Sequence, residues 1–100
     1  MIKHIVMWTL KEEFNGMNKS DIAEELKNQL LALKSKISII KNIEVGVNKI
    51  NHDKNHDVIL ITEFETFEKL AEYSTHPDHM KVVDFVKNIS TGRAAVDFEM

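Results

Sequence analysis

Two segments of the sequence alternate as β-strands do, and both carry apolar side chains on each of their two faces. In residues 2–10, Val6 falls on one face while Ile5 and Met7 fall on the other, and residues 57–65 repeat this arrangement. A strand that is apolar on both sides is normally covered on both faces of its sheet. The chain must therefore cover two faces of a sheet that contains these strands.

Helical periodicity is found in two other parts of the chain. One helix is predicted from about 20 to 37, and a second helical segment begins after Thr66. Pro77 breaks the second segment and fits the first turn of a further helix, which ends near Lys87. The first helix has a single apolar stripe, made of Ile22, Leu26, Leu30, Leu33 and Ile37.

The remaining segments complete the order of elements. Residues 39–50 and 94–100 alternate as strands, residues 51–56 form a polar hairpin turn, and residues 13–19 form a loop. The resulting order, β-α-β-β-α-β, predicts a single α+β domain over residues 1–100. We expect a ferredoxin-like fold with a four-stranded antiparallel sheet.

The predicted helices suffice to cover only one face of such a sheet. The opposite face would expose a large patch of Ile, Val, Phe or Met side chains, which monomeric proteins rarely tolerate. A second copy of the chain packed sheet on sheet would cover this patch, so we expect a homodimer formed through the open sheet face. The alternative is a looser alternation, in which the outer face is mixed and needs no partner.

Charge and composition restrict the partners and the environment of the chain. The formal net charge is -3 and no basic stripe is present, so nucleic acid is not expected as a partner. No segment is apolar over the ~20 residues that cross a bilayer, and the first ten residues are typical of a strand rather than of a signal peptide. Because the chain has no cysteine, it has neither disulfides nor thiolate chemistry, and we expect a cytoplasmic location.

The segment around Pro77 holds groups that exchange protons near neutral pH. Tyr73, His76 and His79 surround this proline, where one helix ends and the next begins. The positive end of the helix dipole disfavours a charged imidazole in the first turn, and a neutral His79 could act as a general base. The alternative is that His76 merely caps the helix and that His79 is a partly solvated surface residue.

The candidate catalytic set consists of His79, Tyr73, Asp97 and His4. The Tyr73 hydroxyl could act as an acid in the same cleft, although a lone helical tyrosine more often packs its ring and leaves its hydroxyl in water. His4 lies in the first strand, where a hydrogen-bonded core residue is the ordinary interpretation. Asp97, in the last strand, is the carboxylate that would orient His79; otherwise it belongs to a solvated strand face with Arg93.

No cofactor and no metal site are predicted from the sequence. The five histidines do not show the ligand spacing of a known metal motif. A haem would need an axial histidine over an apolar pocket, which His79 could supply formally, but nothing else indicates haem. Phosphate-binding glycine loops are also absent, since the only glycines are Gly16, Gly46 and Gly92.

Four segments together resemble the stress-responsive α/β-barrel (Dabb) family across essentially the whole chain. They are IKHIVMWTLKEE at the start, DVILITEF in the third strand, YSTHPDHMKVVDFV around the proline and AAVDFEM at the end. The resemblance implies one Dabb-like domain, with a ferredoxin-like subunit. It also implies a homodimer in which two sheets pack face to face as a dimeric α+β barrel.

The resemblance leaves several activities open. Many members of this family have no assigned activity, some plant members are associated with stress tolerance, and one group consists of polyketide cyclases. In those cyclases a tyrosine and a histidine serve as acid and base near an N-terminal histidine and a late aspartate, which match Tyr73, His79, His4 and Asp97. The cyclases also have a histidine in the third strand, where this chain has an apolar residue, taken as Val58.

Three functional interpretations are compatible with these residues. The first is a small homodimeric protein of unassigned activity with a cleft for a small apolar or aromatic molecule. The second is a polyketide-cyclase-like lyase in which His79 removes a proton beside a carbonyl and Tyr73 donates to the developing oxyanion. The third is a monooxygenase-like activity, which is suggested by fold analogy alone.

Overall fold

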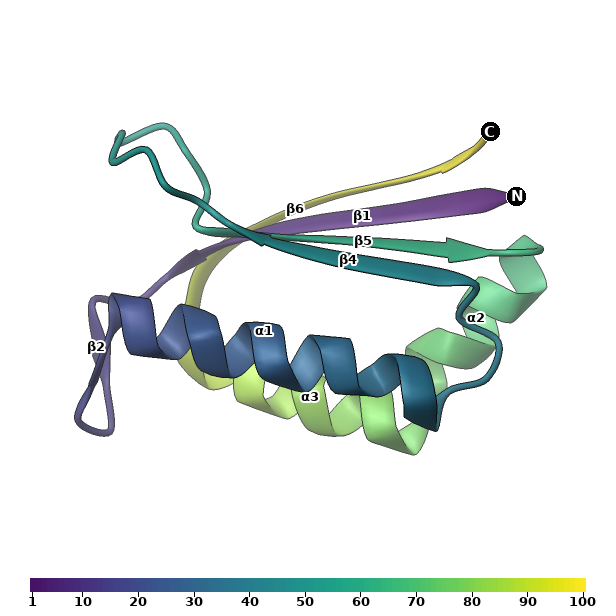
Figure 1. Cartoon of the computed structure of the whole chain (residues 1–100), viewed down its shortest axis with the longest axis horizontal. Helices are drawn as coiled ribbons and strands as arrows, with labels where there is room; N and C mark the ends of the chain where they lie inside the picture. The colour runs from purple at the N-terminus through teal and green to yellow at the C-terminus, as the bar shows by residue number, and fades with distance from the viewer.

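A computed structural model describes residues 1–100 and contains a four-stranded antiparallel sheet with helices on one side (Figure 1). The strands of this sheet are ordered β4-β5-β1-β6. In chain order the elements are β1 (Ile2–Leu10), β2 (Glu13–Phe14), β3 (Met17–Asn18), α1 (Lys19–Lys36), β4 (Asn42–Val47), β5 (Val58–Phe64), α2 (Phe67–Thr75), α3 (Pro77–Ile89) and β6 (Ser90–Glu99). The predicted α+β class and the order of the main elements are confirmed.

The central strand β1 fixes the position of its two neighbours. Val6 of β1 pairs with Leu60 of β5 on one side and with Ala95 of β6 on the other. Strand β4 extends the sheet beyond β5, with Val45 opposite Leu60. Because paired residues project to the same side of a sheet, this register gives all four strands one common face under the helices.

The hydrophobic core lies between this face of the sheet and the helices. Its buried residues come from all three helices and from both central strands, and Thr62 is the only polar residue among the buried ones. Each large apolar side chain buried here stabilises the fold by roughly 1.5–3 kcal/mol. The apolar stripe predicted for the first helix is buried at every position: Ile22, Leu26, Leu30, Leu33 and Ile37.

Helix α1 begins where Asn18 caps it. The Asn18 side-chain oxygen accepts a hydrogen bond from the Asp21 N–H at 2.9 Å, and the Asp21 carboxylate accepts one from the Asn18 N–H at 3.4 Å. This reciprocal capping box pairs two backbone donors that the first turn of a helix leaves free. α1 is the longest helix, yet no helix of the structure is long and apolar enough to cross a membrane.

The segment predicted as a loop at 13–19 contains a small hairpin, formed by β2 and β3. Asn15 and Gly16 connect its two strands with φ angles of 49° and 81°. Positive φ at both central residues is the signature of a type I′ turn, which favours the Asn-Gly pair found here. The prediction of a loop was wrong because strands this short give no alternation to detect.

Two strand boundaries also differ from the prediction. β4 begins at Asn42 rather than at 39, because Ile40 is buried in the core and its N–H bonds back to the Ile37 carbonyl at 3.2 Å. β6 begins at Ser90 rather than at 94, directly after α3. It follows the full length of β1, with a shift in register between Thr9 and Leu10.

The face of the sheet that points away from the helices is uncovered, as Figure 1 shows. We call it the open sheet face, and its large apolar residues are Ile5, Met7, Ile59, Ile61, Val96 and Phe98. Val96 and Phe98 are 52% and 39% exposed. The apolar character that the sequence predicted for both faces of the sheet is therefore present.

Candidate functional site

A pocket of about 420 Å³ lies between the helix-covered face of the sheet and helix α3. Its volume falls within the range of about 300–1,000 Å³ that is typical of small-molecule sites. The apolar part of its wall includes Trp8, Leu30, Leu60, Val82, Val83 and Val86. The cleft expected between helices and sheet is thus present in the fold.

The pocket follows one face of α3 and one face of β1. On α3 the lining positions are 79, 82, 83, 86 and 87, the spacing that keeps residues on one side of a helix. On β1 the lining residues are His4, Val6 and Trp8, which alternate along the strand. Regular secondary structure therefore holds both long walls of the pocket.

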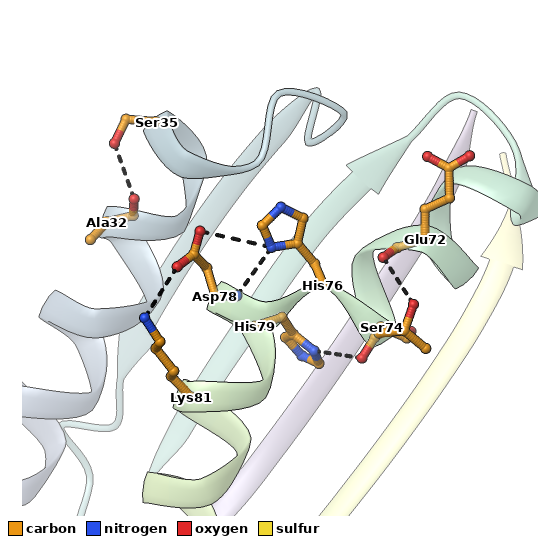
Figure 2. A network of polar contacts seen from close by, with 9 residues as sticks. Ala32, Ser35, Glu72, Ser74, His76, Asp78, His79 and Lys81 are labelled. Atoms are coloured by element: carbon orange, nitrogen blue, oxygen red, sulfur yellow. Dashed lines mark hydrogen bonds and ion pairs between the residues drawn. The ribbon is translucent and has the colours of Figure 1, made fainter.

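The junction between α2 and α3 brings polar groups to one end of the pocket. Thr66 caps α2, and its hydroxyl accepts a hydrogen bond from the Lys69 N–H at 3.1 Å. Pro77 occupies the first turn of α3, and Nδ1 of His76 accepts a hydrogen bond from the Asp78 N–H at 3.1 Å (Figure 2). The interpretation of His76 as a helix cap is confirmed.

Tyr73 is buried at this end of the pocket, with 1% of its surface exposed. Its ring centroid lies 5.0 Å from that of Phe64, 4.2 Å from that of His79 and 6.1 Å from that of His4. The hydroxyl has no hydrogen-bond partner. Burial raises the pKa of Tyr73 well above its ordinary value, so the hydroxyl keeps its proton and is a free donor. The alternative in which this hydroxyl reaches water is wrong.

His79 is half-buried beside Tyr73, and its Nδ1 lies 3.0 Å from the Ser74 carbonyl oxygen (Figure 2). A carbonyl oxygen only accepts, so Nδ1 carries the proton and Nε2 of the neutral ring keeps a free lone pair. Burial lowers the pKa of His79, the bond to Ser74 opposes this effect, and the nearby His4 and His76 add to it. The neutral imidazole was predicted from the helix dipole, but burial is its main cause.

Asp97 pairs with His4 and not with His79. Nδ1 of His4 donates to Oδ1 of Asp97, and the two residues are partners in the β1–β6 register. The prediction that Asp97 orients His79 is wrong, because strand register decides which residue lies beside this carboxylate and the sequence does not define it. The alternative, a solvated strand face, is confirmed: Arg93 and Asp97 are both exposed, and Asp97 accepts the bond from His4 with 44% of its side chain exposed.

Two basic residues of the pocket were not among the predicted site residues. Arg93 and Lys87 both line the pocket. Arg93 shares its strand face with Asp97, so the alternation of the last strand could have identified it as a site residue. Lys87 lies on the same face of α3 as His79. Val58, at the position where the cyclases have a histidine, is buried and does not line this pocket.

The four predicted residues nevertheless form one connected cluster. His4 contacts Asp97, and the Tyr73 ring packs against both His4 and His79. The cluster presents a protonated phenol as donor and a neutral imidazole as acceptor on the wall of an apolar pocket. Groups of these two kinds can carry out general acid–base chemistry. No group of three or more His, Cys, Asp or Glu side chains in the chain could hold a metal ion.

The family model described as Stress responsive A/B Barrel Domain matches residues 2–100. A dimeric protein of unknown function with a ferredoxin-like fold from Bacteroides fragilis is 32% identical, with a TM-score of 0.86 over 99% of this chain and 95% of that chain. A dimeric ferredoxin-like protein of unknown function from Thermobifida fusca is 22% identical, with a TM-score of 0.84 over 99% and 90%.

An antibiotic biosynthesis monooxygenase is 17% identical, with a TM-score of 0.76 over 100% of this chain and 98% of that chain. At this identity the likeness shows the fold alone. No curated protein matches the sequence. Together these similarities confirm the predicted ferredoxin-like fold.

Replacing Tyr73 with phenylalanine is expected to stabilise the protein. A buried donor without a partner costs about 1–3 kcal/mol, and phenylalanine removes this cost while keeping the ring contacts, so the free energy of unfolding should rise by about 1 kcal/mol. Urea denaturation at a fixed protein concentration measures the change. Tyr73→Ala should instead lose about 3–5 kcal/mol through cavity formation. A destabilised Tyr73→Phe variant would mean that the hydroxyl has a partner in the folded protein.

The lowered pKa of His79 should make stability depend on pH. Below 6.5, the ordinary value, the unfolded chain binds a proton at this position more readily than the folded chain does, so this residue makes stability rise with pH in that window. In the His79→Gln variant, the free energy of unfolding should rise less steeply with pH between the pKa of His79 in the folded wild type and 6.5. NMR titration of the His79 ring, with the urea-unfolded chain as control, gives both pKa values directly. A folded value at or above the unfolded one would contradict the burial argument.

Proposed function

This chain belongs to the stress-responsive A/B barrel domain family, and on this premise we propose that it binds a small, mainly apolar molecule in the pocket between the sheet and α3. The similar structures from Bacteroides fragilis and Thermobifida fusca are dimeric proteins of unknown function, so they establish no specific activity. The ligand would lie along α3, with one end at Tyr73 and His79.

The buried hydroxyl of Tyr73 is the observation that carries this proposal. A polar group that is closed off from water usually finds a partner within the protein, and this one has none. Tyr73 is a lining residue of a pocket with apolar walls, and a small movement of its ring would bring the hydroxyl to an oxygen of a bound ligand. Retaining a destabilising hydroxyl is understandable if a bound molecule supplies the missing partner.

We infer that the functional unit is a homodimer formed through the open sheet face. The middle of this face is apolar, with Ile5 and Met7 of β1 opposite Ile61 and Ile59 of β5, while Lys3 and Glu63 pair at one end of it, and a monomer would leave the apolar part in water. Dimeric relatives with the same fold support self-association. The pocket lies on the other side of the sheet, so sheet-on-sheet pairing would leave it free to bind. A cytoplasmic location stays a prediction from composition.

Proton-transfer catalysis of the cyclase type is the second candidate, and the contact between Tyr73 and His79 favours it. Nε2 of His79 would accept a proton from the carbon next to a carbonyl, while the Tyr73 hydroxyl donates a hydrogen bond to the enolate oxygen. The enolate carbon would then attack a second carbonyl of the same molecule. The resulting alkoxide would take the proton from His79, which returns the site to its starting state.

His4 would have a positioning role in that reaction. Its bond to Asp97 fixes the orientation of the ring and uses Nδ1–H as the donor, which leaves the Nε2 lone pair to accept a hydrogen bond from a hydroxyl of the substrate. A monooxygenase activity, by contrast, is suggested by the fold alone, because the antibiotic biosynthesis monooxygenase is only 17% identical to this chain. No contact in the pocket favours that third candidate over the first two.

The binding proposal predicts that a neutral apolar probe enters the pocket. N-phenyl-1-naphthylamine should gain fluorescence with the wild-type protein, and Val83→Trp should weaken its binding about tenfold or more by filling the space beside α3. Asp84→Trp, an exposed neighbour outside the pocket, is the matched control and should bind as the wild type does. Equal binding by the two variants would place the probe elsewhere and refute the proposal.

The homodimer proposal predicts that a charge on the open sheet face separates the subunits. Ile61→Asp would bury an unpaired carboxylate between two sheets, so the variant should sediment as a folded monomer at micromolar concentration, where the wild type sediments as a dimer. Leu31→Asp, on the exposed side of α1, should leave the dimer intact. A monomeric wild-type protein would end this proposal.

The catalytic candidate predicts that Tyr73→Phe and His79→Ala each slow turnover of a linear tetraketide-like substrate by about 10²–10⁴-fold. Product formation is followed by chromatography, with circular dichroism and sedimentation as checks that each variant stays folded. His76→Asn is the matched control, because an asparagine keeps the helix cap while removing an imidazole outside the pocket. Variants that turn over at the wild-type rate, or a wild type without turnover, would exclude this activity.

A further inference from the structure

The charged residues that line the pocket are of one sign. Lys87 and Arg93 are the only permanently charged residues in its lining, and no Asp or Glu is among them. This is unexpected in a chain whose formal net charge is -3. Neither residue takes part in an ion pair of the protein. Two cations therefore border an apolar pocket without an internal counter-charge.

Both basic residues lie at the opposite end of the pocket from the phenol and imidazoles. Lys87 follows His79 by eight residues on α3, which is a rise of about 12 Å at 1.5 Å per residue. Arg93 pairs with Trp8 on β1, while Asp97 pairs with His4, so the strands repeat the same separation of about 13 Å. Helix α3 and the sheet therefore both place the basic residues at one end of the pocket and the phenol and imidazoles at the other.

We propose that the pocket takes an amphipathic carboxylate, whose anionic group lies at Lys87 and Arg93 and whose apolar chain extends toward Tyr73 and His79. This inference rests on the proposed binding function and specifies its ligand class. The guanidinium of Arg93 offers parallel donors that match the two oxygens of a carboxylate, and the ammonium of Lys87 adds a second positive charge. The apolar walls between the two ends would cover an aliphatic or aromatic chain.

The orientation has a chemical consequence at the other end. The exposed basic residues hold the ligand's charge near water, where an anion keeps much of its hydration. The buried Tyr73 hydroxyl and the neutral His79 ring then meet the uncharged end of the ligand. A carbonyl or hydroxyl at that end would satisfy the Tyr73 donor without bringing a charge into the interior.

Isothermal titration with decanoate and decan-1-ol tests this assignment, because the two probes share a chain and differ in charge. Decanoate should bind the wild-type protein more tightly than decan-1-ol. Lys87→Met and Arg93→Met should each weaken decanoate binding by about two- to fivefold, as expected for exposed charge pairs, and leave decan-1-ol binding unchanged. Lys81→Met, on the same helix but outside this pocket, is the matched control and should alter neither affinity.

The outcomes separate this inference from the proposed function. If decanoate binds no more tightly than decan-1-ol, or if decanoate binding survives both substitutions, the carboxylate assignment is overturned while the apolar pocket stands. If neither probe binds the wild-type protein and N-phenyl-1-naphthylamine does not bind either, the binding function fails and the carboxylate assignment fails with it. Thermal denaturation of each variant confirms that the exposed substitutions leave the fold intact.

Discussion

Burial of the two central strands is the constraint on which the rest of this structure depends. β1 and β5 carry apolar side chains on both sides, and the three helices cover only one side. The covered side becomes the core, and the other side becomes a surface that a second chain can remove from water. The same constraint fixes the site, since the helices that cover the sheet also form the walls of the pocket.

The site combines two arrangements that have opposite effects on stability. The capped junction at His76 and the bond between His4 and Asp97 satisfy polar groups and hold the local structure. The Tyr73 hydroxyl instead stays without a partner inside the protein, which costs free energy that its ring contacts offset. A destabilising feature inside a pocket is more informative about function than a satisfied one, because folding alone gives no reason to keep it.

Much of the fold could be predicted from the sequence because its longer elements repeat their patterns several times. The stripe of α1, the alternation of β1 and β5, and Pro77 in the first turn of α3 were all identified correctly. The hairpin around Asn15 and Gly16 was missed because each of its strands has only two residues. The start of β6 was missed because pairing with β1, a distant segment, extends it back to Ser90.

The candidate site shows the same division between local and distant information. Sequence selected His4, Tyr73, His79 and Asp97, and the fold brings all four into one cluster. Which imidazole receives the carboxylate depends on strand register, and alternation gives a residue's face but not its partner across the sheet. The enclosure of Tyr73 depends on how α2 and α3 pack on the sheet, which likewise involves contacts far apart in the chain.

The pocket lies along a single helical face, and this makes its depth adjustable in regular steps. Val82 and Val86 of α3 occupy successive turns between its two polar ends. Successive turns are about 5.4 Å apart, so a bulkier side chain at one of them would shorten the accessible channel by a roughly fixed amount. A single substitution at one of these positions could thus change the chain length of the ligand that a homologue with this scaffold binds. The acid–base residues would stay the same.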